Sequence, residues 1–285
     1  MKFGFILPIG DARTVADLAH DAEQAGWDGL FIPEFVWHID AWVKLTAAAM
    51  RTERIRLGTM LSPLPRMRPW KLASESASLD NLSNGRLILS LGLGAVWMGY
   101  QAFPDEVTDT RLRAELLDEG LDILDLLYQG RQVKYDGKHH HVDLTALDPQ
   151  YYAPPPIQQP RIPLWVVGVW PRMKSMRRVL RCDGLLPEKM TLDGQPGDVQ
   201  PEDLCQMKAY IEANRSLTTP FDFVITGTIL DLSRVLMLEK LEPWSKAGAT
   251  WWLESPYGLP DDEVVARLRH GPPSLEGNRR SQDAG

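Results

Sequence analysis

Short apolar runs alternate with amphipathic segments along most of the chain. The runs that predict strands cover residues 2–7, 29–33, 54–61, 86–92, 162–168, 184–187, 221–229 and 250–254. Most of them are apolar throughout rather than at every second position, which is typical of strands covered on both faces.

Between these runs the apolar positions recur with the period of a helix. Val15, Leu18 and Ala22 form one apolar stripe, with Thr14 as the candidate N-cap and Gly26 as the stop. Further helices are predicted over 40–50, 69–83, 117–128, 172–182, 204–211, 232–247 and 261–270.

This alternation predicts an α/β fold, a (β/α)8 TIM barrel. A doubly wound open sheet remains the alternative, because periodicity does not show whether a sheet closes. Two segments are insertions relative to a minimal barrel. One is the loop that follows the end of strand 4 at residue 92, and the other is the segment 130–161 between helix 4 and strand 5. We expect one domain over 1–270 and a disordered tail over 271–285, which is rich in Gly, Pro and polar residues.

Composition narrows the possible partners. The 285 residues are 44% hydrophobic and 24% charged, as in ordinary globular proteins, and the net charge of −7 with no basic cluster argues against nucleic acid. No apolar run is long enough for a membrane span, and the N-terminus lacks a signal-peptide pattern. Cys182 and Cys205 lie far apart and without metal-ligand spacing. We therefore expect a cytoplasmic protein with reduced thiols.

In such a barrel the active site lies at the carboxyl ends of the strands. Three acids, Glu34, Glu188 and Glu254, fall at predicted strand ends, and His38 follows the second strand closely. Glu34 and His38 are the candidate proton-transfer residues, although a capping acid and a loop histidine are the ordinary alternatives. Glu188 and Glu254, together with Trp42, Trp70 and Trp97, are the candidate walls of a substrate pocket.

Glycines mark two of the strand ends. Gly92 and Gly94 do not match the dinucleotide-binding spacing, but they leave room for a ring or a phosphate to approach the backbone. At "GVWPRMKS" (168–175) a strand ends and a helix begins beside Arg172 and Lys174, which suits a phosphate, although an ordinary strand-to-helix turn would look similar. Three consecutive histidines, 139–141, are expected to be solvated, and no metal site is predicted.

The chain resembles the bacterial luciferase-like family of flavin- or deazaflavin-dependent oxidoreductases. The resemblance is carried by "TERIRLGTMLSPLPRMRPWKLASESASLDNLSNGRLILSLGLG" (52–94), followed in order by "DTRLRAELLDEGLDIL" and "PRIPLWVVG…CDGLLPE". It implies a (β/α)8 barrel, a non-prolyl cis peptide between Met60 and Leu61, and a homodimer, for which the small residues of "LTAAAM" and "ASESAS" offer close packing. The cofactor-binding residues that it implies are Thr59, Met60, Leu61, Leu91, Gly92, Gly94, Ala95, Val167, Gly168, Val169, Arg172 and Lys174.

Three departures from the family pattern weaken the transfer of a deazaflavin sugar-phosphate dehydrogenase mechanism in particular, and they leave the general cofactor site standing. A double glycine that is common at the fifth strand is here Gly168-Val169. Many deazaflavin-using members carry an acid where this chain has Ala95, and a histidine where Phe35 follows Glu34. The first hypothesis is therefore a flavin-dependent monooxygenase that uses reduced FMN, supplied by a separate flavin reductase, and O2 on a small organic substrate.

Three alternatives stay open. The first is hydride transfer with the deazaflavin coenzyme F-420, and the second is a non-catalytic flavin-binding barrel. The third is a barrel hydrolase or isomerase that uses Glu188 and Glu254 without a redox cofactor.

Overall fold

A computed structural model describes residues 1–130, 133–191, 193–229 and 232–273. From residue 274 on, the expected C-terminal tail lies outside the described residues. Within the described ranges, no helix combines the length and the hydrophobicity that a membrane span requires.

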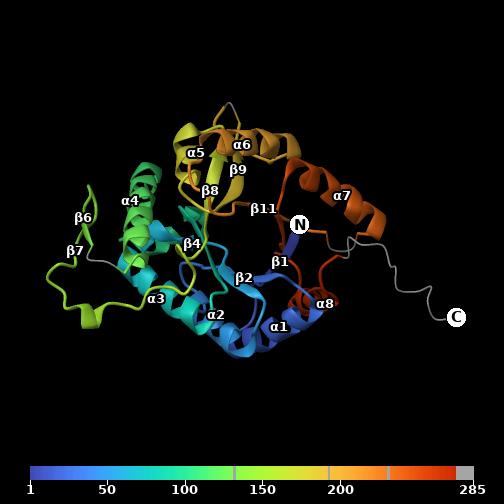
Figure 1. The fold of residues 1–285 in the computed structure, drawn as a ribbon. Coiled ribbons are helices and arrows are strands. Elements are labelled where there is room, and N and C mark those ends of the chain that lie inside the picture. The colour runs from blue at the N-terminus through green and yellow to red at the C-terminus, as the bar shows by residue number, and fades with distance from the viewer. Residues whose placement is uncertain (131–132, 192, 230–231, 274–285) are drawn as a thin grey trace.

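Eight parallel strands in the described part of the chain close into a barrel (Figure 1). They are β1 (Lys2–Ile6), β2 (Gly29–Ile32), β3 (Arg56–Thr59), β5 (Leu87–Gly92), β8 (Leu164–Trp170), β9 (Gly184–Met190), β11 (Asp222–Gly227) and β12 (Trp251–Glu254). Each strand pairs with the next in this order, and β12 pairs with β1 in parallel register, with Phe5 opposite Glu254. The predicted barrel is confirmed and the open-sheet alternative is wrong.

Helices surround the strands (Figure 1). They are α1 (Ala12–Ala25), α2 (Ala41–Arg51), α3 (Pro69–Leu82), α4 (Thr110–Tyr128), α5 (Met173–Val179), α6 (Pro201–Asn214), α7 (Arg234–Ala247) and α8 (Asp261–His270). The predicted cap of α1 was wrong. Asp11 is the N-cap, because its carboxylate accepts a hydrogen bond from the backbone N–H of Thr14. Gly26 ends the helix in the left-handed conformation, as predicted.

The loops carry short additional elements. Beside the barrel mouth lie β4 (Ser62–Pro63), η1 (Leu64–Arg66), η2 (Val96–Met98), η3 (Tyr100–Ala102) and β10 (Pro196–Gly197). The segment between α4 and β8 forms a hairpin of β6 (Lys134–Asp136) and β7 (His141–Asp143), followed by η4 (Pro149–Tyr151). In Figure 1 this hairpin lies at the edge of the molecule, beside α4 and away from the barrel strands.

Large aromatic side chains fill the interior of the barrel below its mouth. The Phe31 ring stacks on Trp165 with 5.3 Å between centroids, and Trp251 packs edge-on against both. A Cβ atom at Gly4 or Gly58 would come within 3 Å of the Phe31 ring, so glycine is needed there for the aromatic packing. Bulky side chains therefore close the lower interior, which leaves the carboxyl ends of the strands for a ligand.

Candidate functional site at the barrel mouth

A cavity of about 580 Å³ opens at the carboxyl ends of β2, β3, β5, β8 and β9. We call it the mouth cavity. Its size falls within the range of small-molecule and cofactor sites. Its lining residues are Pro33, Glu34, Phe35, Val36, Met60, Leu61, Pro63, Leu93, Gly94, Ala95, Trp97, Met98, Tyr100, Leu117, Val167, Val169, Ser175, Arg178, Glu188 and Tyr257.

Glu34 presents a carboxyl group to this largely apolar cavity. Burial raises the pKa of Glu34 to about 7, and the nearby carboxylates of Asp40 and Glu75 add to the rise. The hydroxyl of Ser62 donates a hydrogen bond of 2.5 Å to Glu34 Oε2, which opposes the rise, as does the charge of Arg66. A carboxyl with such a pKa can both give and take a proton near neutral pH.

The backbone between β3 and β4 turns beside the cavity through a cis peptide bond between Met60 and Leu61, as the resemblance implies. Both side chains line the mouth cavity. Thr59, directly before them, is fully buried, and its hydroxyl donates to the carbonyl of Ser90. Thr59 therefore does not line the cavity, which corrects its assignment as a cofactor contact.

Gly92 at the end of β5 and Gly94 just beyond it make room for protein side chains. A Cβ atom at Gly92 would lie 3.0 Å from Leu61 and 3.1 Å from Val167, so these side chains already fill the space beside Gly92. At Gly94, a Cβ atom would meet Tyr100 and Pro63. Gly94 also has a φ of +77°, which glycine adopts without strain. The prediction that both glycines leave empty space for a cofactor ring is therefore corrected. Gly94 lines the cavity, but Gly92 does not.

Leu91 does not reach the cavity either. It is fully buried in the layer between strands and helices, because residues 88 and 90 face the barrel interior and 91 faces outward. Ala95, just beyond the strand, does line the cavity.

The loop after β5 is held down by side chains that sequence reasoning missed. Arg113 of α4 donates to the carbonyl groups of Leu93 and Gly94, and its guanidinium lies 5.3 Å from the centre of the Tyr100 ring. Arg66 packs on the same ring and forms an ion pair of 2.8 Å with Glu106. Arg113 follows Leu93 and Gly94 by 20 and 19 residues in the chain, so no local pattern indicates this contact.

At the turn after β8, the predicted phosphate residues divide into two groups. Val167 and Val169 line the cavity, as do Ser175 and Arg178, whereas Arg172 and Lys174 are exposed and outside its wall. Arg178 is held by Asp118 of α4 through a hydrogen bond of 2.6 Å from Nε, so its charge is already compensated.

Gly168 faces α5 rather than the cavity. A Cβ atom there would meet Leu185 and would lie 2.7 Å from Val179 and 3.2 Å from the sulfur of Met176. Its assignment as a phosphate contact is corrected, because the glycine allows the helix to pack closely on the strand.

Gly168→Ala should therefore lower the free energy of unfolding by about 1–3 kcal/mol, the usual cost of overpacking a core. Chemical denaturation measures this effect. Val169→Ala, on the cavity side of the same strand, is the control and should cost less than Gly168→Ala because it creates no clash. Unchanged stability of Gly168→Ala would contradict the packing role.

The remaining predicted polar residues lie in three different environments. Glu188 lines the cavity, and burial raises the pKa of its carboxyl. Glu254 is fully buried on the outer side of β12, where it accepts hydrogen bonds from the backbone N–H of Ile229 and from the Trp252 indole. His38 is exposed, in ring contact with Phe35 at 5.4 Å, and does not line the cavity. The expectation that Glu254 meets a ligand is corrected, whereas the role of His38 in proton transfer stays a prediction.

The three predicted tryptophans also separate. Trp97 lines the mouth cavity and is 80% exposed, so it stands at the rim. Trp42 is buried within the packing of α2. Trp70 lines a second, outer groove and not the mouth cavity. Only Trp97 of these three therefore keeps its assignment to a substrate pocket.

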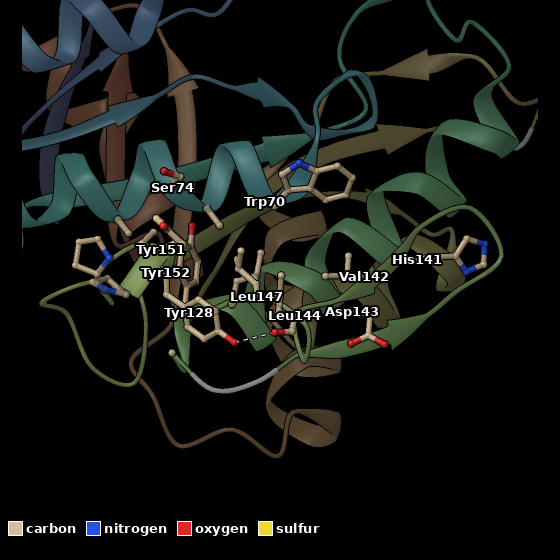
Figure 2. Close-up of a pocket in the computed structure, with 17 residues that line it drawn as sticks. Trp70, Ser74, Tyr128, His141, Val142, Asp143, Leu144, Leu147, Tyr151 and Tyr152 are labelled. Carbon is tan, nitrogen blue, oxygen red and sulfur yellow. Dashed lines mark hydrogen bonds between the residues drawn. The ribbon is translucent and has the colours of Figure 1, made fainter. Parts of the chain in front are cut away.

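The outer groove, of about 430 Å³, lies between α3 and the segment that carries β6 and β7. Figure 2 shows the helix with Trp70 and Ser74 on one side of it and Leu144 and Leu147 on the other. The Tyr152 hydroxyl donates to the Leu144 carbonyl at 2.9 Å, so it is already partnered. The groove is a mainly apolar surface feature on the outside of the barrel.

The histidine run belongs to the hairpin beside this groove. Rings of His139 and His141 pair with different acids, Glu115 and Asp136, at 2.9 and 2.6 Å. In the described ranges, no cluster of three or more His, Cys, Asp or Glu residues is arranged to hold a metal ion.

A closed parallel barrel with a ligand-sized cavity at the carboxyl ends of its strands defines a TIM-barrel protein with its site in the position usual for enzymes of this fold. The chain belongs to the luciferase-like monooxygenase family, whose model matches residues 1–226. Members of this family are oxidoreductases, and the structural neighbours of this chain include both flavin monooxygenases and F420-dependent enzymes.

Among its relatives is an uncharacterised protein of Mycobacterium tuberculosis, 28% identical over 92% of this chain and 93% of that protein. A putative coenzyme F420-dependent oxidoreductase of the same species is 32% identical over 66% of this chain and 55% of the relative. Among solved structures, an F420-dependent secondary alcohol dehydrogenase in complex with an F420–acetone adduct has a TM-score of 0.74 at 14% identity, covering 97% of this chain and 99% of that one. The monooxygenase RslO1 of Streptomyces bottropensis has a TM-score of 0.65 at 20% identity, covering 94% and 97%. These structures support the fold.

Proposed function

We propose that this protein is a flavin-dependent monooxygenase that uses reduced FMN and O2 on a small, uncharged organic substrate. One observation carries the proposal: a carboxyl group with a pKa of about 7, that of Glu34, faces an apolar cavity large enough for a flat ring. Such a cavity can exclude water from a reactive cofactor while the carboxyl group donates or accepts a proton.

The residues present fit a flavin. Apolar side chains of Met60, Leu61 and Val167 line the cavity and would contact the ring faces. Ser175 on the cavity wall, with Arg172 and Lys174 exposed on the same turn, would hold the phosphate end. When bound, the flavin supplies the electron transfer and the reaction with oxygen.

The chain's own contribution would be to orient, to shield and to transfer a proton. Glu34 would exchange a proton with the substrate at its carboxyl oxygen. The rim residues Trp97, Met98 and Tyr257 would cover a bound substrate from solvent, and a separate flavin reductase would supply the reduced cofactor.

The charges around the cavity support an uncharged substrate. Two arginines near it, Arg66 and Arg178, are already paired with Glu106 and Asp118. The acids that line it, Glu34 and Glu188, repel anions when they are ionised. Neither of these two arginines is therefore unpaired and available to bind the phosphate group of a phosphorylated substrate.

Hydride transfer with coenzyme F420 is the second candidate, because a relative of this chain is named as a putative F420-dependent oxidoreductase. Ala95 and Phe35 on the cavity wall disfavour it, since they replace the acid and the histidine found in many deazaflavin-using members.

Anaerobic titration of the purified protein with reduced FMN and with reduced F420, followed by fluorescence, tests the proposal. We expect micromolar binding of reduced FMN and weaker binding of F420. Turnover that depends on O2 then supports the monooxygenase, whereas tight F420 binding with turnover in the absence of O2 supports the second candidate. Binding of neither cofactor would exclude both.

We also propose that the protein is a homodimer that associates through α2 and α3. Met50 on α2 and Leu82 on α3 are 71% and 46% exposed, and a partner copy would cover them. Light scattering should give twice the chain mass of 32.2 kDa, and the double variant Met50→Glu, Leu82→Glu should give a single chain mass. Val235→Glu, at an exposed apolar position on α7, is the control and should remain dimeric. A single chain mass for the unmodified protein at micromolar concentration would refute the proposal.

A further inference from the structure

Three polar side chains form a continuous hydrogen-bonded array behind the mouth cavity. Ser62 Oγ lies 2.5 Å from Glu34 Oε2 and 2.9 Å from Thr59 Oγ1, and Thr59 Oγ1 lies 3.3 Å from the carbonyl oxygen of Ser90. The side chains of Ser62 and Thr59 are fully buried, whereas Glu34 lines the cavity. The array therefore leads from the cavity wall to buried groups and ends at a backbone carbonyl.

We propose that Ser62 and Thr59 are positioning residues that hold the Glu34 carboxyl group toward the mouth cavity, stay hydrogen-bonded to it in both of its protonation states, and stabilise the carboxylate more than the neutral acid. The inference rests on the proposed function in one respect, the role of Glu34 in proton transfer. Its geometry does not depend on which cofactor binds.

The hydroxyl groups can point in two consistent directions. When Glu34 is ionised, Ser62 donates to the carboxylate and accepts from Thr59. When Glu34 carries a proton on Oε2, it donates to Ser62, Ser62 donates to Thr59, and Thr59 donates to the Ser90 carbonyl. Each hydroxyl group has one donor and can accept, so both arrangements keep the chain of hydrogen bonds through Ser62 intact.

The array is not a path for protons through the barrel. Its last member is the carbonyl oxygen of Ser90, which accepts a hydrogen bond but does not pass a proton on. A proton that Glu34 gains or loses must therefore be exchanged on the cavity side, where a substrate would lie. This geometry directs the chemistry of Glu34 toward the ligand.

The charged and titratable groups around Glu34 do not duplicate the role of Ser62. Asp40 before α2 and Glu75 on α3 disfavour the carboxylate, and Tyr100 on η3 interacts with Glu34 without carrying a charge near neutral pH. Arg66 on η1 favours the carboxylate, but it is paired with Glu106. Removing the Ser62 hydroxyl should therefore leave the ionised carboxyl poorly stabilised.

Titration of the Glu34 carboxyl carbon by NMR, on protein labelled at the glutamate side-chain carboxyl, tests this inference without any cofactor. The Glu34→Gln variant assigns the signal. Ser62→Ala should raise the midpoint by about one pH unit, because it removes a hydrogen bond to a charged group. Thr59→Val should raise the midpoint by less, since it removes only the hydrogen bond between Thr59 and Ser62. Ser62→Thr keeps a hydroxyl group at position 62, so its midpoint should lie close to that of the unmodified protein.

Ser90→Ala is the matched control. It also deletes a buried hydroxyl group from the same region, but the Ser90 hydroxyl has no hydrogen-bond partner among the described residues. Its midpoint should equal that of the unmodified protein. A shift as large as that of Ser62→Ala would show a general effect of buried hydroxyl loss and would overturn the proposal.

An unchanged midpoint in folded Ser62→Ala, as judged by circular dichroism, would also overturn it. If Ser62→Ala does not fold, the midpoint of Glu34 in Thr59→Val takes its place: a rise supports the proposal, and an unchanged midpoint overturns it. A protein that shows these shifts but binds neither FMN nor F420 would retain the array and lose the proposed function, so the two failures are distinguishable.

Discussion

Glu34→Gln should lower turnover by about 100- to 10,000-fold, the usual contribution of a general acid or base. Glutamine keeps the shape of the side chain and an oxygen that can accept the Ser62 hydrogen bond, but it cannot exchange the proton. Steady-state kinetics with the cofactor that binds measures the effect. The affinity for that cofactor should change little, because the apolar walls of the cavity are unaltered.

Glu239→Gln, at an exposed position on α7, is the control for the loss of one negative charge and should retain full turnover. Full turnover in Glu34→Gln would remove Glu34 from the mechanism. Glu188, the other acid on the cavity wall, would then be the next residue to replace.

The same substitution should change the pH dependence of stability in a defined direction. The pKa of Glu34 is raised from 4.5 to about 7, so the folded state binds this proton more tightly than the unfolded state does. Its stabilising contribution is therefore complete below pH 4.5 and is lost as the pH rises through 7, by about 3 kcal/mol at most. Relative to the unmodified protein, Glu34→Gln should gain stability between pH 4 and pH 8 in urea denaturation. A difference that does not vary with pH would contradict the raised pKa.

The eight strands could be predicted from the sequence because they are covered on both faces. Such strands are continuously apolar, and each predicted run from 2–7 to 250–254 overlaps an observed strand, although β8 and β9 extend to Trp170 and Met190, beyond the predicted ends at 168 and 187. Closure could not be predicted, because the pairing of β12 with β1 joins residues that are far apart in the chain. The exact cap of α1 was also missed, since Asp11 and Thr14 are both good capping residues and only the geometry distinguishes them.

Glycines in the site illustrate a different limit. A glycine shows that a side chain is missing, but the sequence does not show what fills the space. Leu61 and Val167 fill it at Gly92, and Leu185 and Val179 fill it at Gly168. These neighbours come from other strands and helices, so no local pattern identifies them.

Orientation could have been predicted better for one acid. In β12 the side chains alternate, with Trp251 and Leu253 in the barrel interior, so Glu254 must point outward. The same argument does not apply to Glu34, which lies beyond the end of β2, where the strict alternation stops.

Ala95→Trp should weaken binding of the flavin or deazaflavin by at least about 100-fold. Ala95 lines the mouth cavity at the start of η2, and an indole adds an apolar group of roughly 150–250 Å² of surface to the space that the ring would occupy. The position is half-buried and lies in a loop, so the barrel itself should stay folded. The fluorescence titration with reduced FMN and reduced F420 measures the loss.

Ala102→Trp is the matched control, because Ala102 lies in η3 of the same loop but is exposed and does not line the cavity. It introduces the same side chain and should leave cofactor affinity within a few-fold of the unmodified protein. Equal loss in both variants would indicate that the loop as a whole had moved. Full affinity in Ala95→Trp would mean that the cofactor binds elsewhere, because an indole at position 95 would take up part of the mouth cavity that the ring needs.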